Sequence, residues 1–279
     1  MVRLLQIEFI KLWNNRASRI LIITYFALVT SIALISMVKF DFGEVHFQLA
    51  DQGIFNFPYI WHFNTYFTAW LKLFLAIVIV SMMANEYSNK TLKQNLIDGL
   101  SKREFVLSKF LTVLVFAGIS TLFIFTVSLV LGLIYSDYNE PAIIFSDLEF
   151  VLAYFVKLTG FFAFCLFLGV LVKRSAFALG FLFMWQILEL IATVFLEQKV
   201  FGTQDGNAEF VTGFFPLQSM YNLIEEPITR LNVVKSAASQ LGAAFDLDYH
   251  IQWYEFFIVL GWTALFMYLS LALLKKRDL

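Results

Sequence analysis

The sequence predicts an all-α integral membrane protein in which residues 1–279 form a single transmembrane domain. Hydrophobic residues make up 60% of the chain and charged residues 15%, whereas soluble proteins average about 45–50% and about 25%. A soluble fold cannot bury that much apolar surface, so we expect lipid to surround most of the chain. The apolar stretches are continuous rather than alternating, which favours spanning helices over a β-barrel.

Six stretches are long enough to cross a bilayer, whose core of about 30 Å requires about 20 apolar helical residues. Three of them contain no charge, and three contain one ionisable residue each. No small-residue signal-peptide cleavage site follows the first apolar run, so we expect this first span to stay in the protein as a membrane anchor. The predicted spans are residues 20–38, 65–84, 110–134, 150–172, 176–196 and 256–274.

The distribution of basic residues predicts the orientation of the chain. Of the 20 Lys and Arg residues, 14 fall in the N-terminal segment, the loop after the second span, the turn after the fourth and the C-terminal tail. Basic loops face the cytoplasm, so we expect both termini to be cytoplasmic and the protein to lie in the inner or plasma membrane of the cell. The net charge of −1 and the lack of a basic run argue against a nucleic-acid partner.

Residues 1–19 are predicted to form an amphipathic helix at the membrane surface. At 100° per residue its polar face includes Glu8 and Lys11. Such a helix either anchors the N-terminus to the membrane or acts as a lever joined to the first span, and the sequence leaves both readings open. Its apolar face carries Val2, Leu5, Phe9, Leu12 and Trp13.

The loop after the second span predicts a helix, a break and a second helix, although an ordinary loop remains the alternative. Leu92, Leu96 and Leu100 recur every four residues, which indicates a short amphipathic helix within residues 88–99. A glycine at position 99 can end that helix in the left-handed conformation. The sequence from Ser101 to Glu104 then fits a capping box that starts the next helix.

The order of these motifs resembles the ABC-2-type permeases, the membrane subunits of type V ATP-driven exporters. Six spans and cytoplasmic ends also fit, so the resemblance covers the whole chain. One departure is Leu100-Ser101-Lys102, where the family often has Pro before its Arg. The matching residues are Glu8 and Lys11, then Glu86, Thr91, Leu96, Gly99, Arg103 and Lys109, and finally the tail Lys276-Arg277-Asp278.

The resemblance implies that residues 88–99 are a coupling helix that docks in a groove of a separate ATPase subunit. It also implies that the N-terminal helix, with Glu8 and Lys11, is a connecting helix. Two ATPase copies and a second permease, most simply an identical chain, would complete the transporter. The expected coupling residues are Glu86, Lys90, Thr91, Leu92, Lys93, Leu96 and Arg103, with the leucines as an apolar anchor and the basic groups facing acidic partners.

No phosphate-binding string GxxxxGK[ST] occurs in the sequence. We therefore expect the partner to bind ATP and magnesium, and this chain to carry no cofactor, catalytic residue or metal site.

The expected function is export of a lipid-like, peptide or drug-like substrate. The alternative is a secondary carrier or structural membrane protein without an ATPase. An EExxxR string at Glu225 suggests intramembrane proteolysis, but it lies in a predicted loop and contains a proline.

Three predicted spans carry a charge, namely Lys72, Lys157 and Glu189. Each charge lies seven residues from the outer end of its span, or about 10 Å below the boundary. The fourth and fifth spans are joined by a tight turn, so we expect Lys157 and Glu189 to be level and to form an ion pair. Lys72 is expected either to reach the outer headgroups or to face an anionic or amphipathic substrate.

Two outer loops are also expected to carry structure. Residues 39–64 are rich in aromatic side chains, including Phe55, Phe57 and Trp61. These predict either an aromatic belt at the headgroups or a lid over an exit path. Residues 197–252 form the longest loop, in which we expect short extracellular helices, some of which re-enter the membrane.

Overall fold

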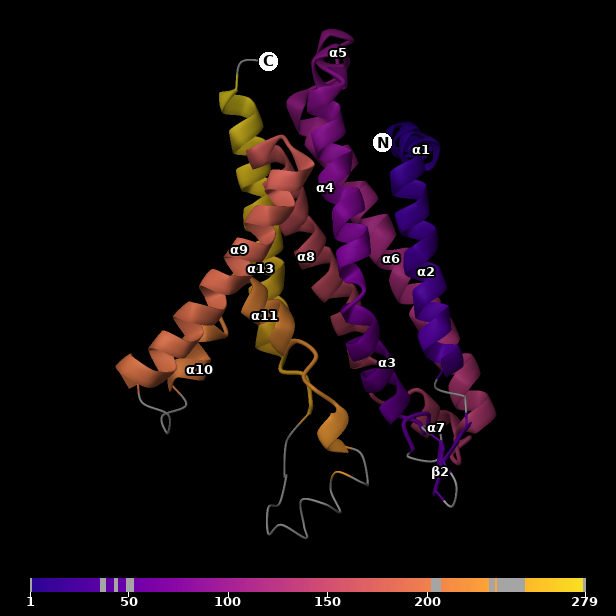
Figure 1. Cartoon of the computed structure of the whole chain (residues 1–279). Helices are drawn as coiled ribbons and strands as arrows, with labels where there is room; N and C mark the ends of the chain where they lie inside the picture. Colours follow the sequence, from indigo (N-terminus) through magenta and orange to yellow (C-terminus); the bar gives the residue numbers. More distant parts are fainter. Residues whose placement is uncertain are drawn as a thin grey trace.

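The computed structural model is a bundle of helices with both chain ends and α5 at one end, which we call the terminal end (Figure 1). Helix α3, helix α7 and a short hairpin lie at the opposite end, which we call the loop end. The structure describes residues 2–35, 39–42, 45–48, 53–201, 207–230, 234 and 249–277. The α-helices are α1 (Val2–Asn14), α2 (Arg16–Ile35), α3 (Tyr59–Ala69), α4 (Lys72–Ser88), α5 (Thr91–Ile97), α6 (Lys102–Tyr135), α7 (Pro141–Ile144), α8 (Glu149–Val172), α9 (Ser175–Phe195), α10 (Asn207–Thr212), α11 (Pro216–Asn222) and α13 (Trp253–Lys276).

Four helical segments in the described part of the chain are long and apolar enough to cross a membrane. They contain α6, α8, α9 and α13, which correspond to the last four predicted spans. The predicted span 65–84 is not one straight helix, because α3 and α4 meet at a bend of 47° and together make up to a fifth span. The predicted span 20–38 corresponds to α2, but residues 36–38 lie outside the described residues. The count of six spans therefore stays a prediction.

Helix α8 forms the centre of the bundle, and it is buried along most of its length. Two glycines allow its neighbours to approach closely, as small residues do between membrane helices. A Cβ atom at Gly160 would lie 2.8 Å from Val259 of α13, and one at Gly169 would lie 2.8 Å from Cβ of Met83 of α4. These positions set the spacing of α8 from both neighbours.

Replacing Gly169 by Ala is expected to lower the free energy of unfolding by about 1–3 kcal/mol, because the backbones of α4 and α8 must separate. Thermal denaturation of the purified protein in detergent measures the loss. Gly180 on α9 provides the matched control, since a Cβ there has open space within 4 Å. Gly180→Ala should leave the stability unchanged or raise it by up to about 1 kcal/mol. Equal effects of the two substitutions would contradict the close packing of α4 on α8.

Helix α9 lies at the edge of the bundle and leans away from the other helices toward α10 (Figure 1). Only 6% of its most apolar stretch is buried inside the protein, compared with 78% for the segment that contains α8. Its exposed side chains include Phe183, Ile187, Leu190 and Ile191. An apolar helix left open on most sides is typical of contact with lipid.

Three aromatic side chains of the segment 39–64 lie where neither alternative expected from the sequence places them. Strands β1 (Lys39–Phe42) and β2 (Val45–Gln48) form a short antiparallel hairpin. Phe55, Phe57 and Trp61 are buried in the core, so these three rings are neither a headgroup belt nor a lid. The indole of Trp61 donates a hydrogen bond to the carbonyl of Ile144 at 2.8 Å, which ties α3 to α7.

Candidate functional site

Five polar side chains from four helices meet at the terminal end of the bundle. We call them the ion cluster: Glu8 and Lys11 of α1, Glu86 of α4, Thr91 of α5 and Lys109 of α6. Four of the five were expected to be functional from the sequence. Their meeting point joins the surface helix, the end of α4 and the short helix α5 to the long helix α6.

Glu86 lies at the centre of the contacts within the ion cluster. One of its carboxylate oxygens accepts from Lys109 at 2.5 Å and from Lys11 at 2.9 Å. The other accepts from the hydroxyl of Thr91 at 2.5 Å. Lys109 also donates to Glu8, whose second oxygen lies 3.4 Å from Lys11. The carboxylate of Glu86 on α4 therefore binds one side chain from each of the other three helices of the site.

The ion cluster is buried and electrically balanced, with two carboxylates facing two amines. The side chains of Lys109, Glu86 and Glu8 are 1%, 4% and 7% exposed. Buried charges require such partners, and removing one partner leaves another uncompensated. Lys11 is more open; burial acts to lower its pKa, but the carboxylates of Glu86 and Glu8 outweigh this and raise it. Its amine therefore remains protonated at neutral pH.

Helix α5 is a separate unit that projects beyond α4 and α6 (Figure 1). Lys90 precedes it in the left-handed conformation with φ 57°, and Gly99 follows it with φ 99°. The hydroxyl of Ser101 accepts from the backbone of Glu104, and the carboxylate of Glu104 accepts from the backbone of Ser101. The predicted order of helix, glycine break and capping box is confirmed.

The exposed surface of α5 differs from the expected one. Leu92 is 2% exposed and therefore does not face outward, whereas Leu96 is partly buried against the core. These leucines fasten α5 to its own chain. The apolar side chain that α5 presents outward is Ile97, which is 70% exposed, and the basic residues Lys90 and Lys93 are also exposed.

Two basic residues of α6 have different surroundings. Arg103, which was expected to face acidic groups on the partner, is exposed on the first turn of α6 and lies outside the ion cluster, so its role in coupling stays a prediction. Lys109, six residues further along α6, is buried at the cluster. The sequence contained a signal for Lys109. The carboxylates of Glu8 and Glu86 together carry two negative charges, and the amine of Lys11 balances only one of them.

The C-terminal tail makes a second connection at the terminal end. The guanidinium of Arg277 donates to the carbonyls of Val170 at 2.5 Å and Leu171 at 2.9 Å, which lie in the last turn of α8. Carbonyls in a last helical turn lack partners within the helix, so a basic side chain satisfies them. The same guanidinium lies 3.3 Å from the hydroxyl of Tyr87, next to Glu86.

The intramembrane charges are arranged differently from the prediction. Within the described residues no ion pair joins Lys157 and Glu189, so that prediction is wrong. Glu189 accepts backbone hydrogen bonds at the start of α11, and Lys157 donates to carbonyls at its end. The amine of Lys72 lies 4.4 Å from the centre of the Phe161 ring, so it packs against α8.

A protein-family model matches most of the chain. The model described as ABC-2 family transporter protein matches residues 16–279, from the first residue of α2 to the end of the chain. The match therefore includes Glu86, Thr91 and Lys109 of the ion cluster, whereas Glu8 and Lys11 precede it. No curated protein matches the chain.

Proposed function

The chain belongs to the ABC-2 transporter family, and we propose that it is the membrane subunit of an exporter driven by a separate ATPase. The ion cluster carries this proposal. Thr91 of the exposed helix α5 binds Glu86 of α4, and the same carboxylate binds Lys11 of α1 and Lys109 of α6. A force applied to α5 at the surface is therefore transmitted to helices that enter the membrane.

The proposed mechanism begins at α5. Thr91 binds the carboxylate of Glu86, and Lys109 binds that carboxylate from α6. Displacing α5 moves α4, which bends by 47° into α3, and it also moves α6. The ATPase changes this arrangement only if its two nucleotide states contact α5 differently, since equal contacts shift no equilibrium.

The exposed face of α5 supports a partner of defined chemistry. Ile97 presents an apolar group, and Lys90 and Lys93 add positive charge beside it. A groove with an apolar pocket and an acidic rim complements this face. The sequence contains no GxxxxGK[ST] string, so ATP and magnesium bind to the partner in this proposal. In this proposal two ATPase copies and a second permease complete the transporter. Both chain ends face the cytoplasm. The substrate is lipid-like, peptide or drug-like.

Purification of the tagged full-length chain in a mild detergent tests the proposal. We expect an ATPase subunit that carries the phosphate-binding string to elute with the chain at one-to-one stoichiometry, with ATP hydrolysis in the complex. A chain that elutes without such a subunit, and that moves solutes in liposomes lacking nucleotide, would instead be a secondary carrier.

A further inference from the structure

Helix α11 lies between two opposite charges, Glu189 of α9 and Lys157 of α8. At its start, the carboxylate of Glu189 accepts from the backbone of Leu217 at 3.0 and 3.1 Å and from that of Gln218 at 3.0 Å. At its end, the amine of Lys157 lies 3.4 Å from the carbonyl of Tyr221 and 3.5 Å from that of Ile224. The two residues that were expected to pair thus contact each other only through α11.

The charges have the signs that the helix favours. Backbone N–H groups at a helix start are positive and unsatisfied, and carbonyls at its end are negative and unsatisfied. An anion at the start and a cation at the end therefore both stabilise α11 in place. The indole of Trp185 donates to Glu189 at 2.6 Å and orients the carboxylate. Lys157 is 3% exposed, so water competes little for its amine.

Packing also contributes to the position of α11, whose residues Pro216, Ser219 and Met220 are buried. Met220 reaches α8, where a Cβ at Gly160 would lie 3.1 Å from its methyl group. The carbonyl of Phe214, just before α11, accepts from Trp262 of α13 at 2.9 Å. Seven residues form too short a helix to be stable without such partners.

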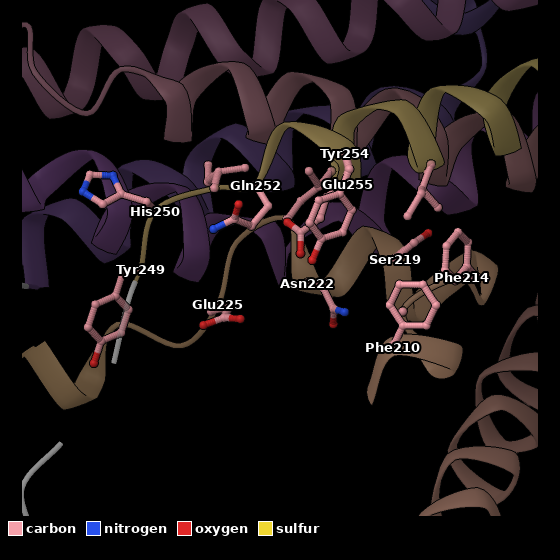
Figure 2. A pocket seen from close by; sticks show the side chains of 14 residues that line it. Phe210, Phe214, Ser219, Asn222, Glu225, Tyr249, His250, Gln252, Tyr254 and Glu255 are labelled. Carbon is pink, nitrogen blue, oxygen red and sulfur yellow. The ribbon is translucent and has the colours of Figure 1, made fainter. Parts of the chain in front are cut away.

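We infer that Glu189 and Lys157 are positioning residues that clamp α11 by its two ends, and that the clamped α11 closes the bundle between α8, α9 and α13. A cavity of about 300 Å³ is lined by residues of α11, of α13 and of the segment 249–252. Ser219 and Asn222 of α11 and Tyr254 and Glu255 of α13 are among the lining residues (Figure 2). Release of α11 would join the cavity to the interior of the bundle. The closure belongs to an export path only under the proposed function, whereas the clamp does not depend on it.

Cysteine labelling tests the clamp without any nucleotide or substrate. The native cysteine, Cys165, is replaced by Ala, and Ser219, which is 2% exposed beside the cavity, is replaced by Cys. The full-length protein in lipid nanodiscs is treated with a membrane-impermeant maleimide, which reaches both faces. We expect slow labelling with the clamp intact and about tenfold faster labelling in Glu189→Gln or Lys157→Met, a change that corresponds to about 1.4 kcal/mol.

Matched variants separate the clamp from a general loss of structure. Lys157→Arg and Glu189→Asp keep the charges and should restore slow labelling. Glu197→Gln and Lys199→Met remove exposed charges just beyond α9 and should leave the rate unchanged. Only protein that elutes as a monodisperse peak in size-exclusion chromatography is labelled. If Glu189→Gln does not fold, Lys157→Met alone tests the clamp.

Unchanged labelling in folded Glu189→Gln and Lys157→Met would overturn the clamp, because packing would then suffice to hold α11. Equal acceleration by the Glu197 and Lys199 controls would overturn it as well. The outcome is separable from the proposed function. A chain that shows the expected labelling but never purifies with an ATPase keeps the clamp and loses the exporter assignment.

Discussion

Lys109→Met is expected to lower the free energy of unfolding by about 3–5 kcal/mol, the range found when one member of a buried ion pair is removed. The substitution leaves the carboxylates of Glu8 and Glu86 facing only Lys11, which already contacts both. It also breaks the link from α6 to α1 and α4. Thermal denaturation in detergent measures the stability, and ATP hydrolysis by the purified complex measures the coupling.

Two further variants make this prediction specific to the ion cluster. Arg103→Met removes an exposed basic side chain from the same helix and should change the stability by less than about 0.5 kcal/mol. Adding Glu8→Gln to Lys109→Met leaves Lys11 paired with Glu86, so part of the lost stability should return. A double variant as unstable as the sum of the two single variants would contradict a shared cluster.

Ile97→Asp is expected to weaken binding of the ATPase about 30-fold or more, because truncating a central apolar anchor typically costs at least about 2 kcal/mol. Ile97 is 70% exposed, so the folded chain alone should lose less than about 0.5 kcal/mol. Co-purification at graded detergent and salt concentrations measures the binding. The chain should still insert and elute as the unchanged protein does.

Ile97→Met provides the control, since it keeps an apolar side chain of similar volume at the same position. We expect it to retain the ATPase and its hydrolysis. If Ile97→Asp retains the partner as well as Ile97→Met does, α5 is not the docking element. If Ile97→Asp unfolds the chain, the exposed position assigned to that side chain is wrong.

The sequence predicts the local structure around α5 well, because local chemistry determines it. Gly99 has the left-handed conformation that a glycine favours, and the capping box from Ser101 to Glu104 needs only neighbouring residues. The four-residue spacing of leucines predicts an apolar face. It does not say whether the chain itself or a partner covers that face, and here the chain covers Leu92.

Contacts between distant segments explain what the sequence did not predict. Helical spacing places Lys157 and Glu189 at similar depths. Re-entrant helices were expected within residues 197–252, but the sequence did not predict that one of them, at residues 216–222, lies between the two charges. The break between α3 and α4 also escaped prediction, because Trp70 and Leu71 continue the apolar pattern across it. Hydrophobicity predicts that a segment lies in the membrane, whereas its bends depend on the neighbours it packs against.

Photo-crosslinking from α5 tests most directly the claim that a separate ATPase moves this chain. A photoreactive phenylalanine replaces Ile97 in cells, and the same group replaces Leu190, which is 63% exposed on α9, as the control. The account predicts that illumination joins position 97, and not position 190, to a subunit that carries the phosphate-binding string, with a yield that changes when ATP is added to the membranes. Absence of that product at position 97, or an equal product at position 190, would contradict the account.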